Sequence, residues 1–323
     1  MGEINKKNKI ILDVKNLKVS FNTAKGKIYA VRDISFQINK AEVFAIAGES
    51  GAGKSVICRS IVNRLERYAK VSGMILFDNK SMLSLKPREL RKLYSKEIAI
   101  LPQHTTALNP LLTIGSHLSE TIKAHFPELK KDEIKDKSIN LLRKFGFSDF
   151  GRIYRAFPYQ LSGGMKQRVL ITLAYSCEPL LVIADEPTKG LDPILKRELL
   201  ETLLEIKNSQ YTSMLLITHD LDAAYRLADN IGIIYNGLFL EKGDCRSVLS
   251  LKAHPYTKTL INSMPEYGLK SDLATEISPG ASDIFLGCPF QRRCKQGKHE
   301  MVHSYREKKI SINHSVWCQN VKG

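Results

Sequence analysis

Hydrophobic and polar positions alternate at the start of the chain and then change period. Ile10 to Val19 and Ile28 to Ile38 alternate or run β-branched, with the turn Lys25-Gly26-Lys27 between them. A period of two is typical of half-buried strands, so these segments predict an antiparallel β start. The apolar run Val43 to Ala47 ends in a glycine-rich loop, and Lys54 to Leu65 continues as a predicted helix. This strand, loop and helix predict the beginning of an α/β layer.

The apolar spacing becomes helical from about Leu108 to Tyr175. Ile114, Leu118 and Ile122 would share one helix face, and a second face would carry Ile139, Leu142 and Phe145. A spacing of three and four residues is typical of amphipathic helices. The segment therefore predicts a helical insertion.

Strands and helices alternate again after the insertion. Leu180 to Ala184 and Met214 to Thr218 have the pattern of buried strands, with a helix predicted from Ile194 to Lys207 and another after His219. Alternating β/α units predict a parallel sheet.

Beyond Gly243 the hydrophobic positions follow neither a helical nor a strand period for long. The residues that interrupt any long element there are Pro255, Pro265, Pro279 and Gly280. We therefore place a domain boundary between Asp244 and Met264. The predicted fold class is α/β, with a first domain over residues 1–250 that includes the helical insertion at about 105–178, and a C-terminal extension over 251–323.

Composition narrows the class of protein. The 323 residues are 43% hydrophobic and 25% charged, which suits one large domain with a small appendage. No run approaches the roughly 18 to 20 apolar residues that a membrane span needs, and the opening MGEINKKNKI lacks the apolar segment of a signal peptide. We therefore expect the chain to stay in the cytoplasm.

The net charge of +16 permits three interpretations: a lysine-rich solvated surface, an anionic membrane surface as partner, or nucleic acid. The first is favoured because unbroken blocks of like charge are short. Six cysteines without an export signal predict reduced thiols. Cys58, Cys177 and Cys245 are scattered, so we expect them to be packing residues.

The clearest chemical signal is a phosphate-binding loop with four free positions between its first glycine and Gly-Lys-Ser. Backbone N–H groups at the start of the following helix would face phosphate oxygens. Lys54 would reach the β- and γ-phosphates, and the Ser55 hydroxyl would bind Mg²⁺. The predicted nucleotide-binding set comprises Gly48, Glu49, Ser50, Gly51, Ala52, Gly53, Lys54, Ser55 and Val56.

Two adjacent carboxylates follow the apolar run Leu180 to Ala184. Successive side chains of a strand point in different directions, so the two carboxylates can have different roles. Asp185 is placed to hold the Mg²⁺ shell, and Glu186 to polarise the attacking water as general base.

Leu161 to Arg168, with the sequence LSGGMKQR, resembles the signature motif of ABC ATPases and lies between the loop and the acidic strand as in that family. The resemblance implies a P-loop NTPase fold with an antiparallel β subdomain, a helical insertion and head-to-tail pairing of two subunits. Ser162, Gly163 and Gly164 would then contact ATP held by the partner.

Further segments resemble motifs of the same family. Gln103 lies in a segment similar to the Q-loop, where it would contact Mg²⁺ and couple the nucleotide state to the insertion, and His219 resembles the switch histidine. Asp192 resembles the D-loop aspartate, although Gly190 stands where alanine is usual. Phe21 lies where the family places an aromatic ring against adenine, with Tyr29 as the second candidate and a buried strand aromatic as the alternative.

The resemblance covers nearly the whole chain and narrows to the oligopeptide, dipeptide and nickel importers. Met165 stands where the signature motif usually has glutamine, which resembles the first of that subfamily's two ATPase subunits. His254 to Leu260 and the cysteine-containing tail resemble the C-terminal segments of the subfamily. The resemblance implies a peripheral ATPase at the cytoplasmic face of the membrane. Its implied partners are a paralogous second ATPase subunit, two transmembrane permease subunits and an extracytoplasmic substrate-binding protein, with no nucleic acid.

Relatives carry four cysteines in this tail, and four thiolates can hold an iron–sulfur cluster. Here only Cys288, Cys294 and Cys318 are present, and Met301 stands at the third family position. A thioether is a poor cluster ligand, so loss of the cluster is favoured over rescue by a histidine among His299, His303 and His314.

Three alternatives remain for the function. A nickel or other small-solute importer would use the same motifs, as would an exporter subunit. A soluble ABC ATPase acting on nucleic acid or the ribosome would fit the positive charge. That class, however, carries long coiled coils or two ATPase domains in one chain, and neither pattern occurs in this sequence.

Overall fold

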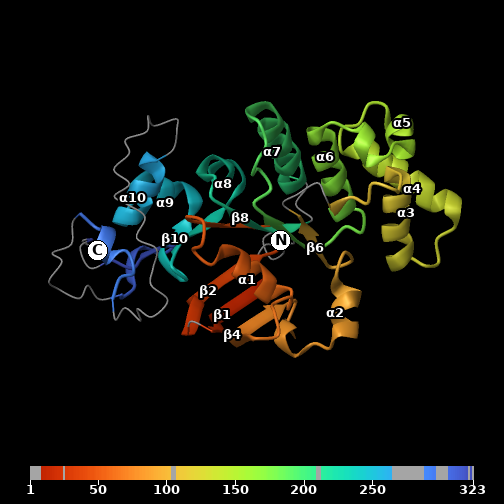
Figure 1. The fold of residues 1–323 in the computed structure, drawn as a ribbon. Coiled ribbons are helices and arrows are strands. Elements are labelled where there is room, and N and C mark those ends of the chain that lie inside the picture. Colours follow the sequence, from red (N-terminus) through yellow and green to blue (C-terminus); the bar gives the residue numbers. More distant parts are fainter. Residues whose placement is uncertain are drawn as a thin grey trace, which may run out of the picture. The chain divides into compact units, whose positions relative to one another are not determined.

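The computed structural model describes residues 9–24, 26–102, 107–208, 212–263, 287–295, 305–318 and 321. The chain forms two compact units (Figure 1). Unit 1 comprises the described parts of Met1–Ile11, Asn39–Glu42 and Leu85–Leu215. Unit 2 comprises those of Leu12–Ile38, Val43–Ser84 and Leu216–Gly323. Each unit is described separately.

Unit 2 contains the predicted antiparallel start, in strands β1 (Ile10–Thr23) and β2 (Gly26–Asn39). Strand β1 also pairs antiparallel with β4 (Ala69–Phe77), which pairs with the two-residue β5 (Lys80–Ser81). Alternate side chains of these strands lie inside the unit because successive residues of a strand point to opposite faces. The apolar side chains of β1 and β2 that are buried in this way include Leu12, Val14, Leu17, Val19, Ile34, Phe36 and Ile38.

The α/β part of unit 2 centres on β3 (Val43–Ala47), which is buried along its whole length. It pairs parallel with β9 (Asn230–Tyr235), which pairs antiparallel with β10 (Leu238–Asp244). The strand order in this unit is β5-β4-β1-β2-β10-β9-β3. The helices of unit 2 that precede its C-terminal segments are α1 (Lys54–Ile61), η1 (Met82–Ser84), α8 (Leu221–Leu227) and α9 (Cys245–Leu251).

The C-terminal segments of unit 2 extend the same sheet. They form α10 (Pro255–Asn262), the short η5 (Gln291–Arg293), β11 (Lys308–Ser311) and β12 (His314–Val316), and β12 pairs antiparallel with β10. The fully buried carboxylate of Glu241, on β10, accepts hydrogen bonds from the backbone of Ala253 and His254 and pairs with His314 at 2.8 Å. A buried carboxylate needs such partners, so Glu241 fixes both C-terminal segments to the sheet.

Unit 1 contains the helical insertion and a short parallel sheet. Strands β6 (Ile98–Leu101) and β7 (Leu181–Asp185) pair parallel, and β7 neighbours β8 (Ser213–Thr218), whose first three residues belong to this unit. Figure 1 shows α3 to α6 gathered in yellow and green. The helices of unit 1 are α2 (Pro87–Leu93), α3 (Ile114–His125), α4 (Lys131–Lys144), α5 (Phe150–Arg155), η3 (Pro158–Gln160), α6 (Gly163–Ala174) and α7 (Pro193–Asn208).

Most predicted elements are confirmed, including the fully buried face of Ile114, Leu118 and Ile122 on α3. Helix α1 is shorter than predicted, because it ends at Ile61 and Asn63 adopts a left-handed φ of 47° that a helix cannot continue through. None of the helices in the described part of the chain is long and apolar enough to cross a membrane.

Candidate functional site

The predicted phosphate loop joins β3 to α1 within unit 2, and two of its three glycines are required by close backbone approaches. A Cβ atom on Gly48 would lie 2.2 Å from the carbonyl oxygen of Ile234. A Cβ on Gly53 would lie 2.3 Å from the carbonyl oxygen of Ala30, and Gly53 also has a φ of +103°. Only glycine fits both positions without displacing the backbone. The loop is therefore packed firmly against neighbouring strands.

The loop curls around the buried ammonium group of Lys54. The Nζ atom donates to the carbonyl oxygens of Gly48 at 2.7 Å and Glu49 at 2.9 Å. Helix α1 starts at this lysine, and its N-cap, Gly53, has no side chain to cap the first turn. A cation beside an uncapped helix N-terminus gives positive potential suited to phosphate oxygens. Ser55 and Val56, in the first turn of α1, are half-buried.

Glu49, the second residue of the loop, contacts the C-terminal part of unit 2. Its backbone N–H donates to the Tyr256 hydroxyl at 2.9 Å, and its carboxylate accepts two hydrogen bonds from the Arg293 guanidinium at 2.8 and 3.0 Å. These bonds raise the pKa of Arg293 above its usual range. Sequence reasoning missed both partners, because no motif signals contacts that span 207 and 244 positions of the chain.

The two candidate adenine-stacking rings have different surroundings. Phe21 is half-buried and meets Tyr68 edge-on, with ring centroids 5.9 Å apart. Tyr29 is 37% exposed, and the Lys27 ammonium lies 4.8 Å from its ring centroid. Tyr29, together with Lys27 and Lys70, lines a pocket of about 660 Å³ that Phe21 does not line. The assignment of Phe21 to adenine stays a prediction.

The adjacent carboxylates lie at the end of β7 in unit 1. Asp185 is the last residue of the strand and is half-buried, whereas Glu186 is 8% exposed and adopts a φ of +53°. A glutamate in the left-handed region is uncommon and costs about 1–3 kcal/mol, a strain that clusters at functional sites. The two residues thus differ in burial and in backbone conformation, and the roles predicted for them stay predictions.

The signature-like segment forms the start of α6. The Ser162 hydroxyl caps the helix by accepting the N–H of Met165 at 3.3 Å. A Cβ on Gly164 would approach Leu195, on α7, to 2.3 Å. Gly163 lies between Ser162 and Gly164, and a Cβ added to it would come within 3.8 Å of Leu195, an ordinary contact distance. The atom nearest to a Cβ on Gly164 is Cδ2 of Leu195, the end of a flexible side chain that can shift, so this packing favours glycine at 164 without requiring it.

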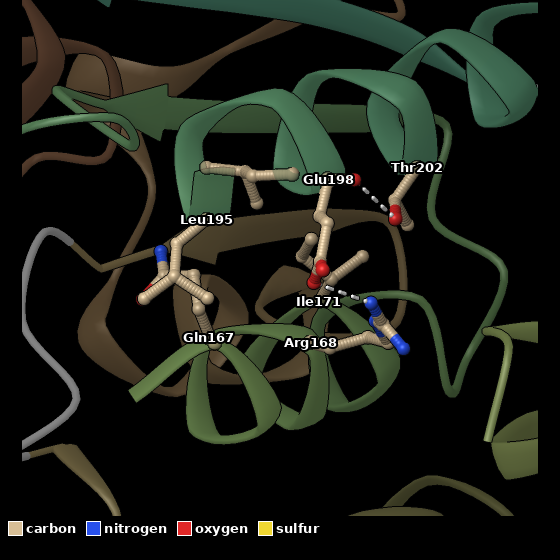
Figure 2. A pocket seen from close by; sticks show the side chains of 8 residues that line it. Gln167, Arg168, Ile171, Leu195, Glu198 and Thr202 are labelled. Atoms are coloured by element: carbon tan, nitrogen blue, oxygen red, sulfur yellow. Dashed lines mark hydrogen bonds and ion pairs between the residues drawn. The ribbon is translucent and has the colours of Figure 1, made fainter. Parts of the chain in front are cut away.

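Figure 2 shows the contact between α6 and α7, around a hollow of about 10 Å³. Arg168 pairs with Glu198 across it at 3.0 Å. Gln167 donates to the carbonyl oxygen of Pro187 at 3.3 Å. Pro187 directly follows Glu186 in the chain. Gln167 therefore links the signature helix to the segment that carries the predicted base.

The remaining predicted residues lie at element boundaries. The Asp192 carboxylate accepts the N–H groups of Ile194 and Leu195, both at 3.0 Å, and so caps the start of α7. His219 is exposed between β8 and α8 in unit 2. Gln103 lies outside the described residues. The nucleotide contacts predicted for all three stay predictions.

The three tail cysteines are buried thiols that form no disulfide bond. Cys288, Cys294 and Cys318 are 7%, 9% and 7% exposed, and burial raises the pKa of Cys288 to about 11. Within the described ranges, no group of three or more His, Cys, Asp or Glu side chains could hold a metal ion. Three thiols are one fewer than the four that usually hold an iron–sulfur cluster, and whether these three bind one stays a prediction. Met301 lies outside the described residues.

His254 and His314 also have structural roles in this region. The Nδ1 atom of His254 accepts the N–H of Tyr256 at 3.0 Å and caps α10, and burial lowers the pKa of His254 to about 3. His254 is therefore neutral near pH 7. His314 is engaged by Glu241, as described above. Both imidazoles thus hold the C-terminal segments in place.

Two protein families match the sequence. Residues 31–189 match the family described as ABC transporter. Residues 240–300 match the oligopeptide/dipeptide transporter, C-terminal region. The first match contains the phosphate loop, the signature-like segment and the acidic strand, and the second contains Arg293 and the first two tail cysteines.

Curated relatives are similar over most of the chain. A dipeptide transport ATP-binding protein of Bacillus subtilis (strain 168) is 41% identical over 315 residues, which cover 95% of this chain and 94% of that protein. An oligopeptide transport ATP-binding protein of Escherichia coli (strain K12) is 34% identical and covers 88% and 85%, respectively.

Solved structures share the fold. A dimeric ATP-binding cassette bound to ADP and Pi has a TM-score of 0.64 and 25% identity, over 73% of this chain and 99% of that chain. A subunit from Clostridium perfringens, part of an ABC transporter complex, has a TM-score of 0.64 and 29% identity, over 80% and 97%.

Proposed function

The chain belongs to the ABC transporter ATP-binding proteins of the oligopeptide/dipeptide transport family, and from that premise we propose that it energises the import of oligopeptides or dipeptides. The chain is an ATPase with the fold of a P-loop ABC cassette. The observation that best supports the peptide class is the match of residues 240–300 to the C-terminal region of peptide transporters. The names of the two curated relatives agree with it.

We propose that the working unit contains two ATPase subunits, since a related cassette was solved as a dimer bound to ADP and Pi. The loop around Lys54 would bind ATP, and Ser162, Gly163, Gly164 and Asp192 would meet nucleotide or loop residues of the partner. The partner would be a paralogous ATPase subunit. Glu186 would act as the general base, with His219 beside the γ-phosphate and Gln103 coupling the site to the helical insertion.

Mg²⁺ accompanies ATP in this reaction, and the residues that would bind it here are Ser55, Asp185 and Gln103. A hydroxyl, a carboxylate and an amide oxygen are hard donors of the kind that Mg²⁺ prefers. When bound, the ion neutralises charge on the phosphate oxygens. This chain's residues orient the nucleotide and hold the attacking water.

In the proposed assembly, the two ATPase subunits dock on two transmembrane permease subunits at the cytoplasmic face of the membrane. An extracytoplasmic protein would deliver the peptide. The ATPase domain would span residues 1–250, with the helical insertion at about 105–178 contacting the permease and the C-terminal extension over 251–323. ATP binding would close the pair and hydrolysis would reopen it, a ligand-driven switch.

The test is uptake of a labelled oligopeptide by source cells whose native copy carries Glu186→Gln, with labelled nickel as a second substrate. We expect peptide uptake to fall to the background level and nickel uptake to be unchanged. Glu201→Gln, an exposed glutamate paired with Arg197 on α7, is the matched control and should leave uptake intact. Loss of nickel uptake alone would contradict the peptide assignment but keep the motor. Normal uptake of both substrates would contradict the importer assignment.

We also propose that the three tail cysteines pack as thiols and hold no iron–sulfur cluster. Anaerobically purified protein is expected to be colourless and to contain less than about one iron per ten chains, because this tail has three cysteines where a cluster usually needs four ligands. Metal analysis and the visible absorption spectrum measure this. Stoichiometric iron with cluster absorbance would overturn the proposal.

A further inference from the structure

All polar groups of Glu49 are held by other residues of unit 2. The N–H donates to Tyr256, the carbonyl oxygen accepts from Lys54, and the carboxylate receives both terminal nitrogens of Arg293. The carbonyl oxygen also accepts the N–H of Ala52 at 3.2 Å, so two of the four partners, Tyr256 and Arg293, come from the C-terminal segments. The first half of the phosphate loop is thus fastened to the part of the chain that matches the peptide-transporter C-terminal region.

The environment of Arg293 makes this attachment specific. The side chain is 15% exposed, and its guanidinium lies 5.7 Å from the ring centroid of Tyr235 and 5.5 Å from that of Phe290. A planar guanidinium that stacks on rings and binds a carboxylate with two parallel bonds loses little freedom on pairing. The fully buried Tyr256 packs against both rings. Lysine or another polar residue could not reproduce this arrangement.

The charge of Glu49 makes the pairing relevant to nucleotide. A carboxylate within a loop that receives a polyphosphate would repel its ligand unless a cation neutralised it. Arg293 supplies that cation and also fixes the direction in which the carboxylate points. The Lys54 ammonium group, the other cation described at the loop, donates to the loop carbonyls of Gly48 and Glu49.

We propose that Arg293 is a positioning residue for nucleotide binding, which neutralises Glu49 and holds the phosphate loop so that the C-terminal extension sets the affinity for ATP. This inference rests on the proposed role of the loop in binding ATP. Arg293 does not touch the nucleotide, and it acts through Glu49. Any change that displaces η5 would therefore weaken ATP binding without altering the hydrolytic residues.

The test compares ATP affinity with turnover. Arg293→Ala is expected to raise the Kd for a fluorescent ATP analogue with Mg²⁺, and the KM for ATP of the assembled transporter, by about tenfold. The kcat should stay within about threefold, because the general base and the signature are unchanged. Arg292→Ala is the matched control: it removes the same charge from the neighbouring exposed position and should leave Kd within twofold.

A double-mutant cycle separates positioning through Glu49 from a general loss of packing. Placed in a Glu49→Gln background, Arg293→Ala should change Kd by less than threefold, because the repulsive carboxylate is gone. If Arg293→Ala does not fold, as judged by its melting temperature, Arg293→Gln keeps the first three side-chain carbons without the charge and replaces it in the same cycle. Equal effects in both backgrounds, or an unchanged Kd in the native background, would overturn the inference.

Lys54→Ala distinguishes this inference from the function on which it rests. If the native chain binds ATP and Lys54→Ala abolishes binding, the loop is the ATP site, and indifference to Arg293 then counts against the inference alone. Binding that does not depend on Lys54 would count against the proposed role of the loop.

Discussion

Glu186→Gln is expected to lower ATP turnover by 100-fold or more while ATP affinity stays within about threefold. A general base contributes about 10²–10⁴-fold, and an amide cannot accept the proton of the attacking water. Glutamine has the same shape and keeps the positive φ of this position, so the comparison isolates the carboxylate. Phosphate release by the assembled transporter, together with binding of a fluorescent ATP analogue, measures both quantities.

The control for this substitution is Glu201→Gln, which removes a carboxylate of the same unit that is exposed on α7. An exposed pair of this kind contributes at most about 1 kcal/mol, so turnover should be unchanged. If Glu186→Gln retained more than a third of the native turnover, another residue would have to activate the water. The strained backbone at Glu186 would then need an explanation other than catalysis.

The phosphate loop and its flanking elements could be predicted because their signals are local. The apolar run of β3, the glycines and the following lysine lie within 12 consecutive positions, residues 43–54, and each has a direct physical meaning. The same holds for the acidic end of β7. Short-range patterns specify such segments because the backbone requirement and the residue type lie at the same position.

The C-terminal segments could be predicted only in part. Pro255 separates α9 from α10, as its role as an interruption predicts, but it also occupies the first turn of α10, where the missing N–H costs nothing and the fixed φ suits a helix. His254 caps this helix through a ring nitrogen, a role that sequence rules assign to Ser, Thr, Asp or Asn. The proline therefore starts an element that the pattern alone did not reveal.

The contacts of Glu49 could not be predicted at all. The carboxylate of Glu49 and the guanidinium of Arg293 are separated by 244 positions, and both residue types are ordinary on a solvated surface. Their pairing depends on β10 and β12 bringing the C-terminal segments to the sheet, which itself depends on the buried Glu241. Long-range contacts of this kind become visible only when the strands are placed.

Gly53→Ala is expected to weaken ATP binding by about 100-fold or more and to lower the free energy of unfolding by about 3 kcal/mol. The new methyl group would lie 2.3 Å from the carbonyl oxygen of Ala30, so the loop or β2 would have to move by about 1 Å. A displacement of that size is enough to cost about two orders of magnitude at a site that depends on fixed donors. The nucleotide-free melting curve and the Kd for ATP report the two effects.

Gly51→Ala is the matched control, because both glycines belong to the same loop and both have positive φ. Gly51 has a φ of +81°, and a Cβ there would meet nothing within 4 Å. It should therefore carry only the backbone cost, about 1 kcal/mol, and keep Kd within about tenfold. Equal losses from the two substitutions would mean that the close approach to Ala30 does not determine the position of the loop. A larger loss at Gly53 would show that packing against β2 holds the phosphate site in place before ATP arrives.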